Sequence, residues 1–230
     1  MAISALVLDF DGVIIDSESG KQNAWFDVLK TDADPAGFSW TTFDSEKLIQ
    51  AAHAAWIEGT ARGSRYDIIE HMMDAVGYPK TKKLIQWYAD RYAEIVRVSV
   101  FSKEVSDDAR KALDELSKKV PLYLNSATPE KELKTVMMEL GLEKYFKGIL
   151  GKAPERYENS KVQNLELVSQ KENIPVEDIL FVGDAESDYL AARTAKTQFV
   201  RFKSFSNEKT WNPEAPRSIT RLSELLHFLA

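Results

Sequence analysis

Four short polar stretches carry the side chains that could do chemistry, and the first of them closes an apolar run near the amino end. Asp9 and Asp11 stand two residues apart in the apolar segment 5–10 and the turn after it. On an extended chain, residues two apart point to the same side. Burying two carboxylates together is unfavourable unless a cation or a proton lies between them. The pair therefore indicates either a site for a hard ion such as Mg²⁺ or an ordinary polar turn.

A second acidic stretch follows the apolar run 179–182. Asp184 and Asp188 are four residues apart, a spacing that places both on one face of the first turn of a helix. Acidic side chains also favour a helix N-terminus through its dipole, so this stretch alone does not require a metal. Two acidic clusters that each close a strand of one parallel sheet meet at one edge, and together they predict a metal site.

The remaining two stretches are a strand end with hydroxyl groups and a lysine that opens a helix. Ser126 and Thr128 follow the strand predicted at 121–125. Backbone N–H groups at such a point favour an anion, although simple capping by either hydroxyl explains the same residues. Lys161 begins the helix predicted at 159–172, where a cation opposes the dipole. It either serves a site or is a solvated surface lysine.

The elements that must position these residues alternate between strand and helix. Residues 17–98 differ from the rest, because their apolar residues recur at three- and four-residue spacing and predict a run of amphipathic helices. We expect an α/β core of residues 1–16 and 99–230, in three layers, with an all-helical insert at 17–98. The strands are expected at 5–10, 121–125, 179–182 and 197–202, and the core helices at 107–119 with Ser106 as N-cap, 129–141, 159–172, 186–195 and 222–229.

Composition excludes several classes of protein. The 230 residues include no cysteine, which removes disulfides, thiolate metal sites and cysteine nucleophiles. The 30 basic and 36 acidic residues give a net charge of −6, so we expect no nucleic-acid partner. No apolar run is long enough to span a membrane, and the amino end indicates a strand rather than a signal peptide. We therefore expect a cytoplasmic protein without a membrane partner.

In this order, the four stretches resemble the haloacid dehalogenase-like hydrolase superfamily over nearly the whole chain. LVLDFDGVIIDSE is similar to its first motif, LYLNSATPE to the second, Lys161 to the third and FVGDAESD to the fourth. The helical insert resembles the C1-type cap of that superfamily, and DGVIIDSE resembles its phosphoglycolate phosphatase and β-phosphoglucomutase-like branch. The resemblance implies a Rossmann-like parallel sheet with a helical cap. It also implies a Mg²⁺-dependent phosphatase that acts on a small phosphorylated metabolite.

The resemblance also implies a role for each residue of the core site. Asp9 would be the nucleophile that forms an aspartyl-phosphate, and Asp11 the general acid and base. Mg²⁺ would be held by Asp9, the backbone carbonyl of Asp11 and Asp184. Asp188 would be either a further metal ligand or an orienting partner. Lys161 would neutralise Asp9 and the transferring phosphoryl group.

Substrate contacts are expected from both parts of the chain. Ser126 and the Ala127 N–H would hold the phosphoryl oxygens beside Asn125, while Lys21 and Arg62 are cations of the insert that could reach an anionic substrate. The branch usually has a histidine where this chain has Lys21, which disfavours β-phosphoglucomutase activity. Two alternatives stay open: a phosphosugar mutase that uses the same aspartyl-phosphate, and a non-catalytic binding protein on the same fold.

Overall fold

The computed structural model describes residues 2–29, 35, 50, 65–75, 77, 80–99, 105–156, 160–203 and 217–229. The chain divides into two compact units, one of residues 1–16 with 103–230 and the other of residues 17–102. The first contains the α/β part and the second the helical part. That they fold as separate domains, with boundaries after residues 16 and 98, stays a prediction.

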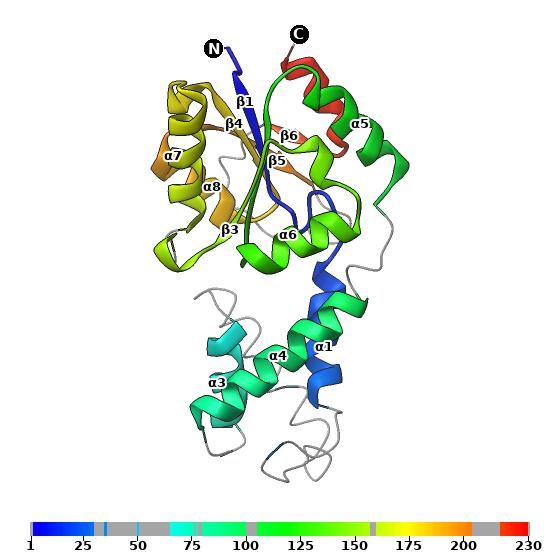
Figure 1. The fold of residues 1–230 in the computed structure, drawn as a ribbon, viewed down its shortest axis with the longest axis vertical. Helices are drawn as coiled ribbons and strands as arrows, with labels where there is room; N and C mark the ends of the chain where they lie inside the picture. Colours follow the sequence, from blue (N-terminus) through cyan, green and yellow to red (C-terminus); the bar gives the residue numbers. More distant parts are fainter. Residues whose placement is uncertain are drawn as a thin grey trace. The chain divides into compact units, whose positions relative to one another are not determined.

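A six-stranded parallel sheet forms the centre of the first unit (Figure 1). The strand order is β3-β2-β1-β4-β5-β6, and every pairing is parallel. This confirms the predicted Rossmann-like α/β fold. Two of the strands, β3 and β6, add to the four expected from the sequence. The strands are β1 (Ala5–Leu8), β2 (Leu122–Pro129), β3 (Gly148–Lys152), β4 (Ile179–Gly183), β5 (Gln198–Phe202) and β6 (Ser218–Ile219).

Helices cover both faces of the sheet. In Figure 1, α7 and α8 lie together on one side and α5 and η5 on the other. Ser106 caps α5 as predicted, because its side-chain oxygen accepts a hydrogen bond from the Ala109 N–H at 3.2 Å. The final segment, expected as a helix at 222–229, is a 3-10 helix. The helices are α5 (Asp107–Ser117), α6 (Glu130–Glu139), α7 (Ser160–Glu172), α8 (Glu186–Ala195), η2 (Glu143–Tyr145), η3 (Pro154–Arg156), η4 (Val176–Asp178) and η5 (Leu222–Phe228).

The core explains why the strand before the first acidic pair is an unbroken apolar run. All four residues of β1 are buried, because the strand has neighbours on both sides and helices over both faces. Ala5 and Val7 pack with Phe181 of β4 and Leu165 of α7 in one layer of the core. Leu6 and Leu8 point to the opposite face, since side chains alternate along a strand.

The second unit is helical in its described residues. Helix α4 (Lys82–Ser99) contacts both α1 (Glu18–Leu29) and α3 (Arg65–Ala75). Trp25 of α1 stacks on Tyr92 of α4, with ring centroids 3.9 Å apart. Residues 30–34, 36–49 and 51–64 of the insert expected to be helical lie outside the described residues. No helix in the described part of the chain could cross a membrane.

The strand order creates a switch point beside β1. Its neighbours are β2 on one side and β4 on the other, and the chain connections run away from it in both directions. Ligands of open α/β sheets bind at such points, beyond the carboxyl ends of the strands. Asp9 directly follows β1, Asp184 directly follows β4, and Ser126 lies in the last part of β2. The fold therefore brings three of the four polar stretches to one edge.

Candidate active site

Asp9 is buried at this edge and has a hydrogen-bond donor on each carboxylate oxygen. It is 4% exposed, and its N–H donates to the Val182 carbonyl at 2.8 Å, which continues the pairing of β1 with β4. Its Oδ1 accepts from the Phe10 N–H at 2.9 Å. Its Oδ2 accepts from Lys161 Nζ at 3.0 Å. The side chain is thus fixed by a backbone donor on one oxygen and by a cation on the other.

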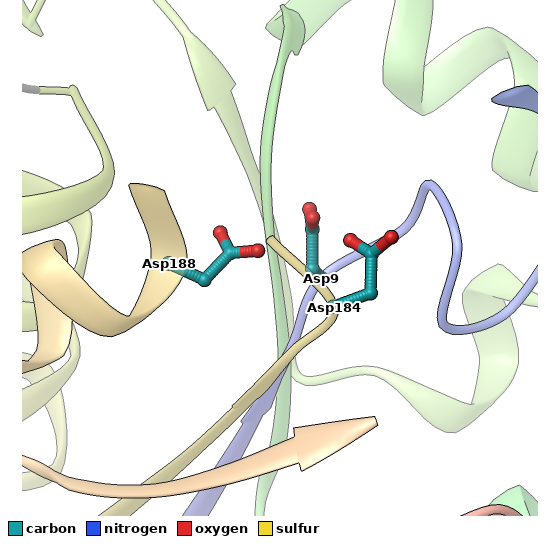
Figure 2. A group of neighbouring side chains, drawn as sticks. All are labelled: Asp9, Asp184 and Asp188. Carbon is teal, nitrogen blue, oxygen red and sulfur yellow. The ribbon is translucent and has the colours of Figure 1, made fainter. Parts of the chain in front are cut away.

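Asp9 lies in a cluster of three carboxylates. Asp9, Asp184 and Asp188 each place one oxygen within 4.8 Å of the others. Figure 2 shows Asp188 reaching from α8 toward Asp9, with Asp184 on the other side of Asp9. Carboxylates this close repel one another unless a cation is present, and oxygen ligands suit a hard ion such as Mg²⁺. The donor set therefore fits the predicted metal.

Asp11 stands outside this side-chain cluster. It is half-buried, and its backbone forms an isolated bridge with Ile15 in the turn that Gly12 opens. The expectation that only its backbone carbonyl binds the metal stays a prediction, as does its role in proton transfer.

Lys161 is a largely buried lysine that contacts the acidic cluster, and not a solvated surface lysine. Its side chain is 15% exposed, and its ammonium donates to both Asp9 and Asp188. The second oxygen of Asp188 accepts from the Ala185 N–H at 3.1 Å. Asp188 contacts Lys161 directly, as an orienting partner would, and the choice between that role and a further metal ligand stays a prediction.

The charges of the three carboxylates and Lys161 favour the binding of an additional cation. Burial raises the pKa of Asp9, and the charges of Asp188, Asp11 and Asp184 raise it further against the opposing effect of Lys161. Burial alone would lower the pKa of Lys161, but Asp188 and Asp9 outweigh that effect and raise it above its usual range. Lys161 therefore stays protonated, and a cation bound between the carboxylates would favour ionised Asp9.

Two glycines leave room for the acidic side chains, Gly12 for Asp184 of the other loop and Gly183 for Asp188 of its own segment. Gly12 has a φ of +73°, and a Cβ at this position would lie 2.2 Å from Oδ2 of Asp184. A Cβ on Gly183 would lie 2.4 Å from Cβ of Asp188. Only glycine leaves room for both contacts, so the glycines next to the acidic residues have a steric function.

The end of β2 contributes the predicted hydroxyl. Ser126 is buried, and its Oγ accepts from the Thr128 N–H at 3.1 Å, while Ala127 is exposed. Asn125 is also buried, and its amide donates to the Lys161 carbonyl at 2.9 Å. That bond ties the end of β2 to the first turn of α7.

Two of the predicted substrate contacts belong to the helical unit. Lys21 lies half-buried in α1, and Arg62 lies outside the described residues. Sequence reasoning missed Asn164, a fully buried residue of α7 that bonds to Asn125. The sequence shows only a polar residue three positions after Lys161 in the same helix, which by itself does not indicate a function.

Comparison with known proteins gives a family and several relatives. The family model described as haloacid dehalogenase-like hydrolase matches residues 3–196. The chain is 27% identical over 194 residues to phosphoglycolate phosphatase 1 of Pseudomonas aeruginosa, a match that spans 83% of this chain and 65% of the relative. It is 24% identical over 200 residues to phosphoglycolate phosphatase of Photorhabdus laumondii, across 84% of this chain and 77% of that protein.

Solved structures show the same fold. One is a Bacillus subtilis protein, provisionally assigned as a HAD-hydrolase and bound to magnesium, with a TM-score of 0.73 and 16% identity. The alignment covers 100% of this chain and 99% of that one. The overall fold of this chain thus also occurs in a protein of low sequence identity.

Proposed function

The chain belongs to the haloacid dehalogenase-like hydrolase family, as its motifs predict, and on that premise we propose that it is a Mg²⁺-dependent phosphatase of a small phosphorylated metabolite. The observation that carries the proposal is the buried contact of Lys161 with Asp9 and Asp188, beside Asp184, at the switch point of the sheet. The two curated relatives support it, since both are phosphoglycolate phosphatases by name. The Bacillus subtilis structure with bound magnesium supports the metal.

Asp9 is the nucleophile of the proposed reaction. One of its carboxylate oxygens attacks phosphorus, the bond from phosphorus to the ester oxygen breaks, and Asp11 gives a proton to the departing alcohol. In the second step water attacks the aspartyl-phosphate, Asp11 takes the proton of that water, and the Asp9 carboxylate is released with inorganic phosphate. The reaction thus proceeds through two displacements, each with its proton accounted for.

The residues around Asp9 neutralise the charge of the phosphoryl group and hold its oxygens in position. Lys161 neutralises the buried carboxylate and the negative charge that grows on the phosphoryl oxygens. Ser126 accepts from a backbone N–H, which leaves its hydroxyl hydrogen to donate to a phosphoryl oxygen, together with the Ala127 N–H. Asp188 orients Lys161 through its direct contact.

Asp9, Asp184 and the backbone carbonyl of Asp11 would hold Mg²⁺. The ion, when bound, offsets the repulsion between the nucleophilic carboxylate and the anionic phosphoryl group. Gly12 keeps the loops after β1 and β4 close enough for both carboxylates to reach one ion.

The test is a phosphate-release screen over phosphorylated metabolites, with and without Mg²⁺. It includes 2-phosphoglycolate because of the two relatives. Release should require Mg²⁺, should be slower with Ca²⁺, and should stop in Asp184→Asn. Glu186→Gln is the matched control, since Glu186 is an exposed acid of the same segment. Full activity in excess chelator, or an isomerised product without free phosphate, would contradict the proposal.

A further inference from the structure

Two buried asparagines connect the sheet to the backbone of Lys161. Asn164 Nδ2 donates to Asn125 Oδ1 at 3.0 Å and to the Gly151 carbonyl at 3.3 Å. Asn125 Nδ2 in turn donates to the Lys161 carbonyl at 2.9 Å. A continuous set of hydrogen bonds therefore runs from β3 through both side chains to the first turn of α7.

Packing alone does not explain this pair. Asn125 and Asn164 are both 0% exposed, and a buried amide is unfavourable unless its donors and acceptors find partners. An apolar side chain would fill either position without that requirement. The amides add direction, because each bond fixes both a distance and an angle between the elements it joins.

A close approach of β3 to β2 supports the network. A Cβ on Gly151 would lie 2.5 Å from the Thr128 carbonyl oxygen and 2.6 Å from Cα of Glu130. The glycine lets β3 run directly beside the end of β2, where its carbonyl meets Asn164. The Gly151 carbonyl, which accepts the first hydrogen bond of the network, thus lies near the carboxyl ends of the strands, where the site also lies.

Lys161 is consequently anchored at both ends. Asn125 holds its carbonyl, while Asp9 and Asp188 hold its ammonium. A lysine side chain is a flexible four-carbon stem, so its ammonium is well placed only if its backbone is fixed relative to its partners.

We infer that Asn164 is a positioning residue, which acts through Asn125 to hold Lys161 against Asp9 for the reaction. The inference rests on the phosphatase activity proposed above. It gives the amide of Asn125 a role toward Lys161, while the substrate contact expected from the sequence stays a prediction. We call the hydrogen bonds from Asn164 through Asn125 to the Lys161 carbonyl the clamp. Because Lys161 acts on charge that develops in the transition state, loss of the clamp should lower kcat more than it raises KM.

The test compares Asn164→Leu with the wild type in phosphate release. We expect kcat to fall at least about tenfold, with KM within about threefold. Ser169→Ala is the matched control, because it removes another hydrogen bond of α7, from Ser169 Oγ to the Ile174 carbonyl at 2.7 Å. That variant should keep its kcat at a comparable loss of thermal stability. Asn164→Ser, which is smaller and still polar, replaces Asn164→Leu if the latter does not fold.

Two further measurements separate positioning from general damage. In a Lys161→Ala background, Asn164→Leu should cause little additional loss of rate, because the clamp acts through Lys161. A crystal structure of Asn164→Leu should show Lys161 Nζ displaced from Asp9. A kcat within about twofold of wild type, or an unmoved Lys161, would overturn the inference. A wild type without phosphate release would contradict the proposed function instead, and the crystal structure alone would then decide whether the clamp positions Lys161.

Discussion

Charge balance at the level of single residues favours a divalent ion in the acidic cluster. When Asp9, Asp184 and Asp188 are all ionised, three carboxylates face one ammonium, that of Lys161, which leaves two negative charges unbalanced. Because Asp9 and Asp188 are buried, water screens this excess poorly. One divalent cation would compensate both charges, whereas a second lysine would compensate only one.

Gly12 gives a sharp steric test of the metal site. Gly12→Ala should push Asp184 aside, because its Cβ would lie 2.2 Å from Oδ2. We expect activity to fall at least about tenfold and the Mg²⁺ concentration for half-maximal rate to rise. The control is Gly141→Ala, which has a similar φ of +64° and nothing within 4 Å of the added Cβ. It should cost about 1–2 kcal/mol of stability and leave the metal dependence unchanged. Equal effects of the two variants on metal dependence would refute the steric role.

Lys161 was singled out by the motif resemblance, whereas the positions of Asp9 and Asp184 were predictable because each directly follows an apolar strand. The choice between ligand and orienting partner for Asp188 was not, since it depends on which donors face its two oxygens. Asn164 was not predictable either. A single asparagine within a helical pattern carries no motif, and its importance comes from a partner on another element, Asn125.

Helix α7 is held at its far end as well as at Lys161. Glu172 accepts from the Tyr123 hydroxyl of β2, and from Lys147 Nζ at 2.8 Å. Burial raises the pKa of Glu172, but the hydrogen bonds from Lys147 and Tyr123 outweigh it and leave the pKa below its ordinary value of 4.5. A carboxylate with a lowered folded-state pKa stabilises the protein above its unfolded pKa, and that contribution disappears as pH falls through the folded value.

Glu172→Gln should therefore lower the free energy of unfolding by about 1 kcal/mol at pH 7 and have a smaller effect under acidic conditions. Denaturant titrations of wild type and variant at neutral pH and below the pKa of Glu172 measure both values. Asp114→Asn is the control, because the Lys118–Asp114 pair is exposed and should contribute little. The same loss at both pH values would show that the ionised form of Glu172 is not what stabilises α7.

Strands β1 and β4 were predictable because burial on both faces demands a continuous apolar run. Strand β3 was missed, since two of its five residues are glycine and it lies at the sheet edge with only partial burial. Strand β6 has two residues, too few to show a pattern. The last helix was expected at nearly the right place, but apolar spacing does not distinguish a 3-10 from an α-helix over so short a segment.

For the whole molecule, the change of apolar period after β1 predicted the helical segment, and the described helices α1, α3 and α4 agree with it. The site lies where the loops after β1 and β4 meet, so a ligand there cross-links two parts of the chain far apart in sequence. An ion that binds only the folded protein must then raise the stability of the whole α/β unit.

Mg²⁺ should accordingly raise the thermal midpoint of the protein in the absence of any substrate. The expected stabilisation is about 2.7 kcal/mol at a hundredfold excess over Kd. Thermal melts with Mg²⁺ and with chelator measure it. Asp184→Asn should abolish the shift, while Glu186→Gln, with its exposed side chain, should retain it. An undiminished shift in Asp184→Asn would place the metal elsewhere.

The most direct test of the account is the rate of Mg²⁺-dependent phosphate release by Asp9→Asn beside wild type. The amide nearly matches the carboxylate in shape but cannot form an aspartyl-phosphate, so the rate should fall at least about a hundredfold. The fold should persist, because burial already disfavours the charge on Asp9, and a thermal melt provides that control. A folded Asp9→Asn protein that keeps more than a few per cent of the wild-type rate would contradict the assignment of Asp9 as the nucleophile.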